Sequence, residues 1–271
     1  MRFKADLTEG VAVETVRRLV IFMSRLNKKR CIIRVTPTEF ILLNDSSTSR
    51  SYWIEAKIKQ DEMFGDYELH GLSTKNNEIY MALSASDLAQ ALSGVESMIK
   101  LRLTKDGTTP HLSVKTENVN NSIPVNMLMW RQWSEFQRNL NPNDLYIGVY
   151  LPNLKLLQKI LTSVKNTHAK HVMIATTFSG EIQIIARTDT AKVMVCLSDL
   201  TAERYELTRD IDDRMAVKTV LDCKNLYQFI SNIPNSYSYV FLQIDKIGNA
   251  FFSTSQADSS ITIALPGHNR V

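Results

Sequence analysis

The chain reads VRRLVIFMSRL from Val16 to Leu26, and its apolar residues recur at the three- and four-residue spacing of an amphipathic helix. A second stretch reads LKLLQKILTSV from Leu154 to Val164 and repeats that spacing. Val16, Leu19, Met23 and Leu26 each have an apolar counterpart at one constant offset, which is 154 − 16, or 138 residues. The recurrence predicts two copies of one structural unit.

A second pair of helical segments keeps the same offset, because Leu83, Leu88 and Leu92 map onto Leu221, Leu226 and Ile230. Strand-like runs and turn residues surround both pairs in the same order. We therefore predict an α+β fold with two similar domains, in which short helices pack on one face of antiparallel sheet. The predicted bounds are 1–129 for the first domain, 130–144 for a linker and 145–271 for the second.

Cations are concentrated on one predicted helix of each domain, although the whole chain carries a net charge of only +4. The helical face opposite the first apolar stripe bears Arg17, Arg18, Arg25 and Lys28 together with Glu14. The second helix places Lys155 and Lys159 one turn apart, and no acid lies between residues 152 and 171. Such asymmetry favours a polyanionic partner, although a solvated basic face is the alternative.

A surface of this kind would contact phosphates and read no base sequence. No recognition-helix, zinc-finger or RNA-binding motif accompanies the cations. The three cysteines, Cys31, Cys196 and Cys223, are widely spaced, and we expect buried free thiols in a reducing compartment. The N-terminus has no hydrophobic signal core and no apolar run is long enough to span a bilayer, so a soluble intracellular protein without membrane contact is expected.

Enzyme chemistry finds little support in the sequence. The acids between Asp199 and Asp213 alternate with arginines, as in a solvated loop, and His168 and His171 have no acidic or thiol partner nearby. No glycine-rich phosphate loop or nucleophile motif is present. We expect no enzymatic activity, no metal and no cofactor. In the linker, Trp130 and Trp133 could dock partner peptides, and packing of the linker on the sheets is the alternative.

Three stretches resemble one protein family. They are EMFGDYELHGLS from Glu62 to Ser73, continued by Asn76–Tyr80; the start MRFKA; and the helix entry DCKNLYQF from Asp222 to Phe229. These residues resemble the Hus subunit of the heterotrimeric nine-one-one DNA-damage checkpoint clamp, which belongs to the PCNA-like sliding clamps. The resemblance implies a ring of three subunits, with sheets outside and helices lining the hole.

The resemblance also implies residue roles and partners. Arg18, Arg25, Lys165 and Lys224 would face duplex DNA, whereas Ser93 stands where the family tends to have a lysine. The expected partners are two other clamp subunits (Rad-nine-like and Rad-one-like, 1:1:1), a clamp loader, and cell-cycle checkpoint and DNA repair proteins in the nucleus. A homotrimeric replication processivity clamp remains an alternative within the fold, and a metal-dependent nuclease is an alternative outside it.

Overall fold

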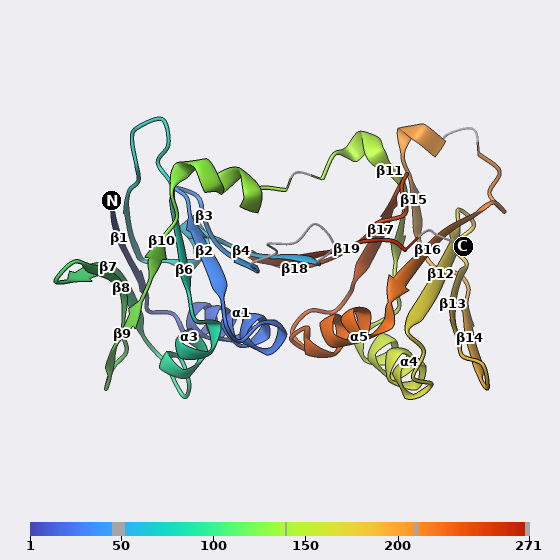
Figure 1. Cartoon of the computed structure of the whole chain (residues 1–271), viewed down its shortest axis with the longest axis horizontal. Coiled ribbons are helices and arrows are strands. Elements are labelled where there is room, and N and C mark those ends of the chain that lie inside the picture. The colour runs from blue at the N-terminus through green and yellow to red at the C-terminus, as the bar shows by residue number, and fades with distance from the viewer. Residues whose placement is uncertain (45–51, 139, 209–210, 269–271) are drawn as a thin grey trace. The chain divides into compact units, whose positions relative to one another are not determined.

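The computed structural model describes residues 1–44, 52–138, 140–208 and 211–268 (Figure 1). The chain divides into two compact units. The first comprises Met1–Ser46, Ile54–Arg138 and Gln256–Ile261, and the second comprises Ser47–Trp53, Asn139–Ser255 and Thr262–Val271. Each unit combines antiparallel sheet with helices, as the sequence predicts.

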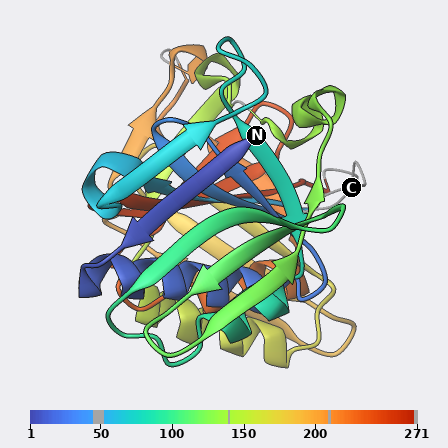
Figure 2. The ribbon, with the colours of Figure 1, turned by 90° about the vertical axis from the view of Figure 1, so that its left-hand side faces the viewer.

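The first unit contains α1 (Gly10–Leu26), the short α2 (Gln60–Met63) and α3 (Ala85–Ala91). The apolar stripe of α1 is buried, with Val16, Leu19 and Met23 no more than 2% exposed. Helix α1 packs beside α3 beneath the sheets of its unit (Figure 2). Ser84 caps α3, because its hydroxyl accepts the Asp87 N–H at 3.2 Å. Helix α3 ends at Ala91, and Gly94 shortly after it adopts φ +71°, a conformation that glycine adopts without strain.

Two antiparallel sheets form the rest of the first unit. Their strand orders are β5-β1-β7-β8-β9 and β10-β6-β2-β3-β4. The strand bounds are β1 Arg2–Leu7, β2 Cys31–Val35, β3 Glu39–Asn44, β4 Trp53–Lys59, β5 Asp66–His70, β6 Ile79–Leu83, β7 Ile99–Asp106, β8 Thr109–Lys115, β9 Asn120–Pro124 and β10 Asn126–Met127.

The second unit has the helices α4 (Leu154–Asn166) and α5 (Cys223–Asn232), which pack against each other. Its strands have the orders β14-β13-β12-β16 and β19-β18-β17-β11-β15. The bounds are β11 Leu145–Tyr150, β12 His171–Thr177, β13 Ile182–Arg187, β14 Lys192–Leu197, β15 Ala202–Arg204, β16 Ala216–Asp222, β17 Phe241–Asp245, β18 Ala250–Gln256 and β19 Ser259–Leu265.

The two units repeat one topology. The order β5-β1-β7-β8-β9 recurs as β15-β11-β17-β18-β19, and β4-β3-β2-β6 recurs as β14-β13-β12-β16. A strand–helix–strands–helix–strands order is also common to both. Equivalent strands occupy equivalent sheet positions, so the structure confirms the duplication that the helix offset indicates.

The structure shows local features that the sequence pattern leaves open. Pro152 lies before α4, whose cap is Asn153, and the Asn153 side chain accepts the Leu156 N–H at 3.0 Å. The charged stretch after Asp199 contains the short strand β15. The predicted linker, residues 130–144, fits neither helix nor strand patterns in the sequence, and its described part includes two 3₁₀ helices, η1 (Trp130–Phe136) and η2 (Pro142–Asp144). These short turns lack the long apolar period that reveals an α-helix.

Trp133 belongs to the core of the first unit, which argues against its predicted role in docking partners. Its ring is 8% exposed and stacks on Tyr80 with the ring centroids 4.7 Å apart. The indole N–H donates to the Leu128 carbonyl at 3.1 Å, and Gln137 donates to the Tyr80 hydroxyl at 2.8 Å. Trp130 is 64% exposed, so a docking role for that residue stays a prediction.

We expect Trp133→Ala to lower the free energy of unfolding by about 3 kcal/mol, because a buried aromatic ring and its hydrogen bond are lost. Trp130→Ala is the matched control and should change the free energy by less than about 0.5 kcal/mol. Urea denaturation followed by circular dichroism measures both. Equal losses for the two variants would contradict the packing role of Trp133.

Candidate nucleic-acid interface

The cations of α1 lie on the side of the helix away from its buried stripe. Arg18 and Arg25 are exposed and Arg17 is half-buried. Glu14 holds two of them: Arg17 Nε donates to Glu14 Oε2 at 2.7 Å, and Arg18 Nε donates to Glu14 Oε1 at 2.6 Å. One carboxylate therefore neutralises part of the charge that the sequence assigns to this face.

The pKa of Glu14 records this pairing. Desolvation raises the pKa, but hydrogen bonds from Arg17 and Arg18 together with their charges outweigh that effect and leave the pKa below its ordinary value. Because the pKa is lowered in the folded protein, the ion pairs contribute their full stability at pH values above the ordinary pKa of a glutamate. That contribution is lost only as the pH falls through the lowered value. Glu14 is therefore ionised at neutral pH and competes with any anion for the two arginines.

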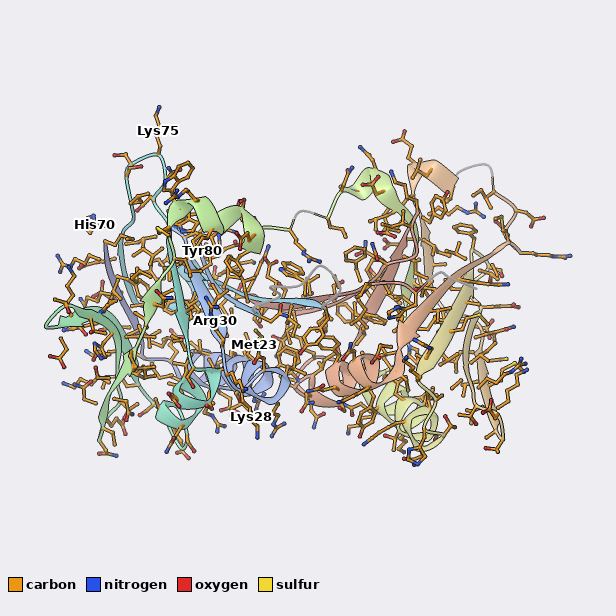
Figure 3. All side chains as sticks on the ribbon, viewed as in Figure 1. Met23, Lys28, Arg30, His70, Lys75 and Tyr80 are labelled. Carbon is orange, nitrogen blue, oxygen red and sulfur yellow. The ribbon has the colours of Figure 1, made fainter. Side chains whose placement is uncertain are left out.

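Lys28 lies outside the helix on which the sequence pattern places it. Helix α1 ends at Leu26, with Asn27 as its C-cap, so helical spacing no longer fixes the direction of Lys28. Lys28 is exposed on the connection to β2, near the end of α1 in Figure 3. Figure 3 also places Lys75 at the far side of the first unit, on the loop after β5. Lys28 remains a candidate as a loop residue.

Helix α4 presents three exposed lysines, Lys155, Lys159 and Lys165. Leu157, Leu161 and Val164 are at most 2% exposed, and this burial turns the lysines toward solvent. The Lys165 ammonium lies 4.3 Å from the centroid of the Tyr227 ring on α5. A cation over an aromatic face keeps its charge and its remaining donors, so Lys165 stays available to an anion.

Helix α5 adds one exposed cation, Lys224, in its first turn. The helix begins after its N-cap Asp222, whose carboxylate accepts the Asn225 N–H at 2.8 Å. Helix α3 reads ASDLAQA and carries no cation, only Asp87. In both units the longer helix therefore supplies most of the positive charge, and only in the second does the shorter helix contribute to it.

Exposed ammonium and guanidinium groups of this kind are suited to hydrogen bonds with phosphate oxygens. Within the described residues, no group of three or more histidine, cysteine, aspartate or glutamate side chains could hold a metal ion. Of the acids between Asp199 and Asp213, Asp213 forms an ion pair with Arg204, and Asp210 lies outside the described residues. The described part of the chain contains no helix with the length and apolar content of a membrane span.

The sequence did not predict that the strand β14, which reads KVMVCL, is an exposed sheet edge. None of its six residues is buried, Met194 is 52% exposed, and β14 ends its sheet. Cys196 is exposed, which corrects the expectation that this thiol is buried, whereas Cys31 and Cys223 are buried free thiols. Exposure alternates along β14, so Met194 and Cys196 lie on the face that is turned to solvent, whereas Val193, Val195 and Leu197 are half-buried on the other.

The stretch that carries the family resemblance has structural roles. Glu78 receives two hydrogen bonds from Arg34, at 2.9 and 3.1 Å, and Arg34 also lies over the ring of Tyr80. A Cβ on Gly71 would lie 2.4 Å from the Glu78 nitrogen, so the position admits only glycine without a backbone shift. Because Tyr80 in turn stacks on Trp133, these residues position the η1 turn.

Comparison with known proteins agrees with this architecture. A family model described as Hus1-like protein matches residues 1–268. The chain is 26% identical over 250 residues to the human Checkpoint protein HUS1, covering 85% of this chain and 86% of that protein. It is 22% identical over 237 residues to the Drosophila melanogaster Checkpoint protein Hus1-like, covering 80% and 84%.

Solved sliding clamps share the fold at low sequence identity. The PCNA structure from Thermococcus kodakaraensis superposes with a TM-score of 0.70 at 11% identity, covering 98% of this chain and all of that one. Proliferating Cellular Nuclear Antigen from Entamoeba histolytica gives 0.71 at 14% identity, covering 98% of both chains. The fold is therefore that of a PCNA-like sliding clamp, and the chain belongs to the Hus1-like protein family.

Proposed function

We propose that this chain is the Hus1-type subunit of a heterotrimeric checkpoint clamp that encircles duplex DNA, marks damage and serves as a platform for signalling and repair proteins in the nucleus. The observation that supports it best is the recurrence of exposed cations on α1 and α4, the equivalent helices of two duplicated units. The membership of the Hus1-like family and the clamp fold support the same role. The subunit is non-catalytic, and it contributes surface rather than chemistry.

The proposed DNA contact requires only phosphates. Exposed lysine and arginine side chains release counterions on meeting phosphates and read no base sequence. A ring that surrounds DNA needs little affinity, because encirclement itself prevents escape. Weak and salt-sensitive contacts also permit sliding.

Changing Arg18, Arg25, Lys165 and Lys224 together to alanine should weaken DNA binding by the assembled ring and leave folding intact. All four side chains are exposed, so little packing is lost. Four lost phosphate contacts should lower the slope of log affinity against log salt by about three to four units. Fluorescence anisotropy over a salt series measures the slope, and duplexes of different sequence should behave alike. An unchanged slope would identify these cations as a solvated face.

Glu14→Gln should have the opposite effect and tighten DNA binding. The substitution removes the carboxylate that holds Arg17 and Arg18 and leaves a side chain of similar size. The salt slope should steepen by about one unit for each arginine that then meets a phosphate. Glu62→Gln, on the exposed surface of α2, changes the net charge equally and is the matched control. If both variants gained the same affinity, overall charge rather than release of the arginines would be responsible.

Ring assembly is proposed to continue the sheets edge to edge through β14 and through β9, the last strand of its sheet in the first unit. An exposed apolar edge strand is a template for pairing with another chain and is usually protected in monomers. Five of the six β14 residues, Val193 to Leu197, are apolar. A neighbouring subunit would bury them and satisfy their backbone groups.

Cys196 reports on this assembly. In the isolated chain it should react with maleimide, while Cys31 and Cys223 stay unmodified because both are buried; burial also raises the pKa of the Cys31 thiol to about 12. In the 1:1:1 ring the Cys196 rate should fall at least about tenfold through loss of access. Mass spectrometry locates the label, and light scattering should show a monomer for the chain alone. A protected Cys196 in a trimer of this chain alone would favour the homotrimeric clamp instead.

A further inference from the structure

In the first unit, the outer edge of β6 is covered by the chain itself. Asn126 of β10 lies opposite Ala82, and Met127 lies opposite Met81. The covering strand continues one residue further, since the Leu128 N–H donates to the Tyr80 carbonyl at 2.9 Å. The β6 edge is thus sealed by an extended segment.

The duplicate strand in the second unit is β16, which occupies the same place in its sheet order as β6 and lies beside β12 in Figure 1. A segment approaches its outer edge at the equivalent point. The His268 N–H donates to the Val220 carbonyl at 2.7 Å, and Val220 lies 220 − 82, or 138 residues, after Ala82. Within the described residues no strand continues along this edge, because β16 is the last strand of its sheet.

Residues of β16 two and four positions before Val220 share its orientation, since backbone groups of a strand alternate between its two neighbours. Lys218 and Ala216 therefore direct their N–H and C=O groups to the open edge. Lys218 and Val220 line up with Ala175 and Met173 of β12 on the other side. The open edge offers main-chain donors and acceptors without a described strand to take them.

A cavity of about 200 Å³ adjoins this edge. Its lining includes Tyr146, Ile211, Met215, Val217, Lys218, Lys246 and Asp245. Met215 is 56% exposed, and Ile247, which follows Lys246, is 65% exposed. The cavity therefore combines apolar side chains with two ammonium groups and one carboxylate.

The charged side chains at the cavity indicate what kind of ligand it would bind. Lys246 forms an ion pair with Asp144, and the Asp245 carboxylate accepts the N–H groups of Ile247 and Asn249. Lys218 is exposed and forms no ion pair within the described part of the chain. Lys218 occupies the position in the second unit that Tyr80 occupies in the first. Because the Tyr80 ring stacks on Trp133, the second unit lacks at this position the aromatic ring against which a turn like η1 could pack. A peptide with an apolar side chain next to a carboxylate would therefore fit the cavity and the exposed Lys218 ammonium.

We propose that the open edge of β16 binds an extended acidic peptide segment of a partner protein by strand addition. The peptide main chain pairs with Lys218 and Ala216, one large apolar side chain enters the cavity, and a carboxylate faces Lys218. This inference rests on the platform role proposed above and gives that role a location. It requires neither DNA nor ring assembly, so it is tested separately from them.

The probe is the capped peptide Glu-Glu-Val-Phe-Val-Glu-Glu, added to the full chain. Strand addition predicts slower hydrogen exchange at the amides of Lys218 and Ala216, and saturable binding by fluorescence anisotropy of the labelled peptide. The same peptide with N-methyl groups on alternate residues retains the side chains but cannot pair, and it should bind at least about tenfold more weakly. Lack of binding at millimolar peptide, equal binding of the methylated peptide, or protection of β14 in place of β16 would overturn the proposal.

Lys218→Glu should weaken the acidic peptide about fivefold or more and favour the version with lysine in place of glutamate. Lys192→Glu, on the other edge strand of the same sheet, is the matched control and should change neither affinity. An equal effect of both variants would overturn the site. So would protection of the Lys218 amide without peptide that disappears when residues 269–271 are removed, because the chain's own tail would then fill the edge. DNA binding of rings made with Lys218→Glu, measured in parallel, shows whether the proposed function stands independently.

Discussion

Burial of a single apolar stripe on α1 and on α4 fixes how these helices present their charges. Leu19 and Val164 are completely buried, and Val16 is 1% exposed. Each such side chain contributes about 1.5–3 kcal/mol on burial, whereas an exposed ion pair contributes about 1 kcal/mol at most. The apolar residues therefore set the rotation of each helix about its axis. This rotation determines where the cations lie. The positions that remain in solvent are occupied by Arg18, Arg25, Lys155 and Lys159.

In both units the buried stripe turns the longer helix so that its cations face solvent, but the cations have different partners in the two units. In the first, Glu14 bonds both Arg17 and Arg18, so an arriving phosphate must compete with a carboxylate. In the second, Lys165 rests against Tyr227, which restrains the ammonium without neutralising it. Helix α4 carries no acid at all. Duplication thus preserves the burial pattern while the electrostatics of the two faces diverge, and the second face keeps more of its formal charge.

Periodicity is sufficient to predict what depends on local sequence. The helices α1, α4 and α5 lie where the apolar spacing predicts helical segments, because a buried stripe involves residues a few positions apart. Features that depend on distant residues could not be predicted in this way. Cys196 lies in an apolar run, and only the sheet order reveals that β14 is an edge. For Trp133 the sequence leaves docking and packing open, and the choice depends on Tyr80, a residue far away in sequence on which the Trp133 ring stacks.

The sequence of this chain can differ widely from those of the solved clamps because the fold depends on the kind of side chain at each position more than on its identity. A fold held by buried stripes and sheet pairing needs apolar character at given positions, not given residues, and 11–14% identity still yields TM-scores of 0.70–0.71. A surface that meets only phosphates is equally permissive, since any exposed cation at about the right place serves. Glu78 and Tyr80, which belong to the stretch on which the sequence resemblance rests, have specific partners. Arg34 donates two hydrogen bonds to Glu78, and Tyr80 stacks on Trp133 of the η1 turn. These contacts need particular side chains, whereas the proposed DNA-facing role needs charge alone.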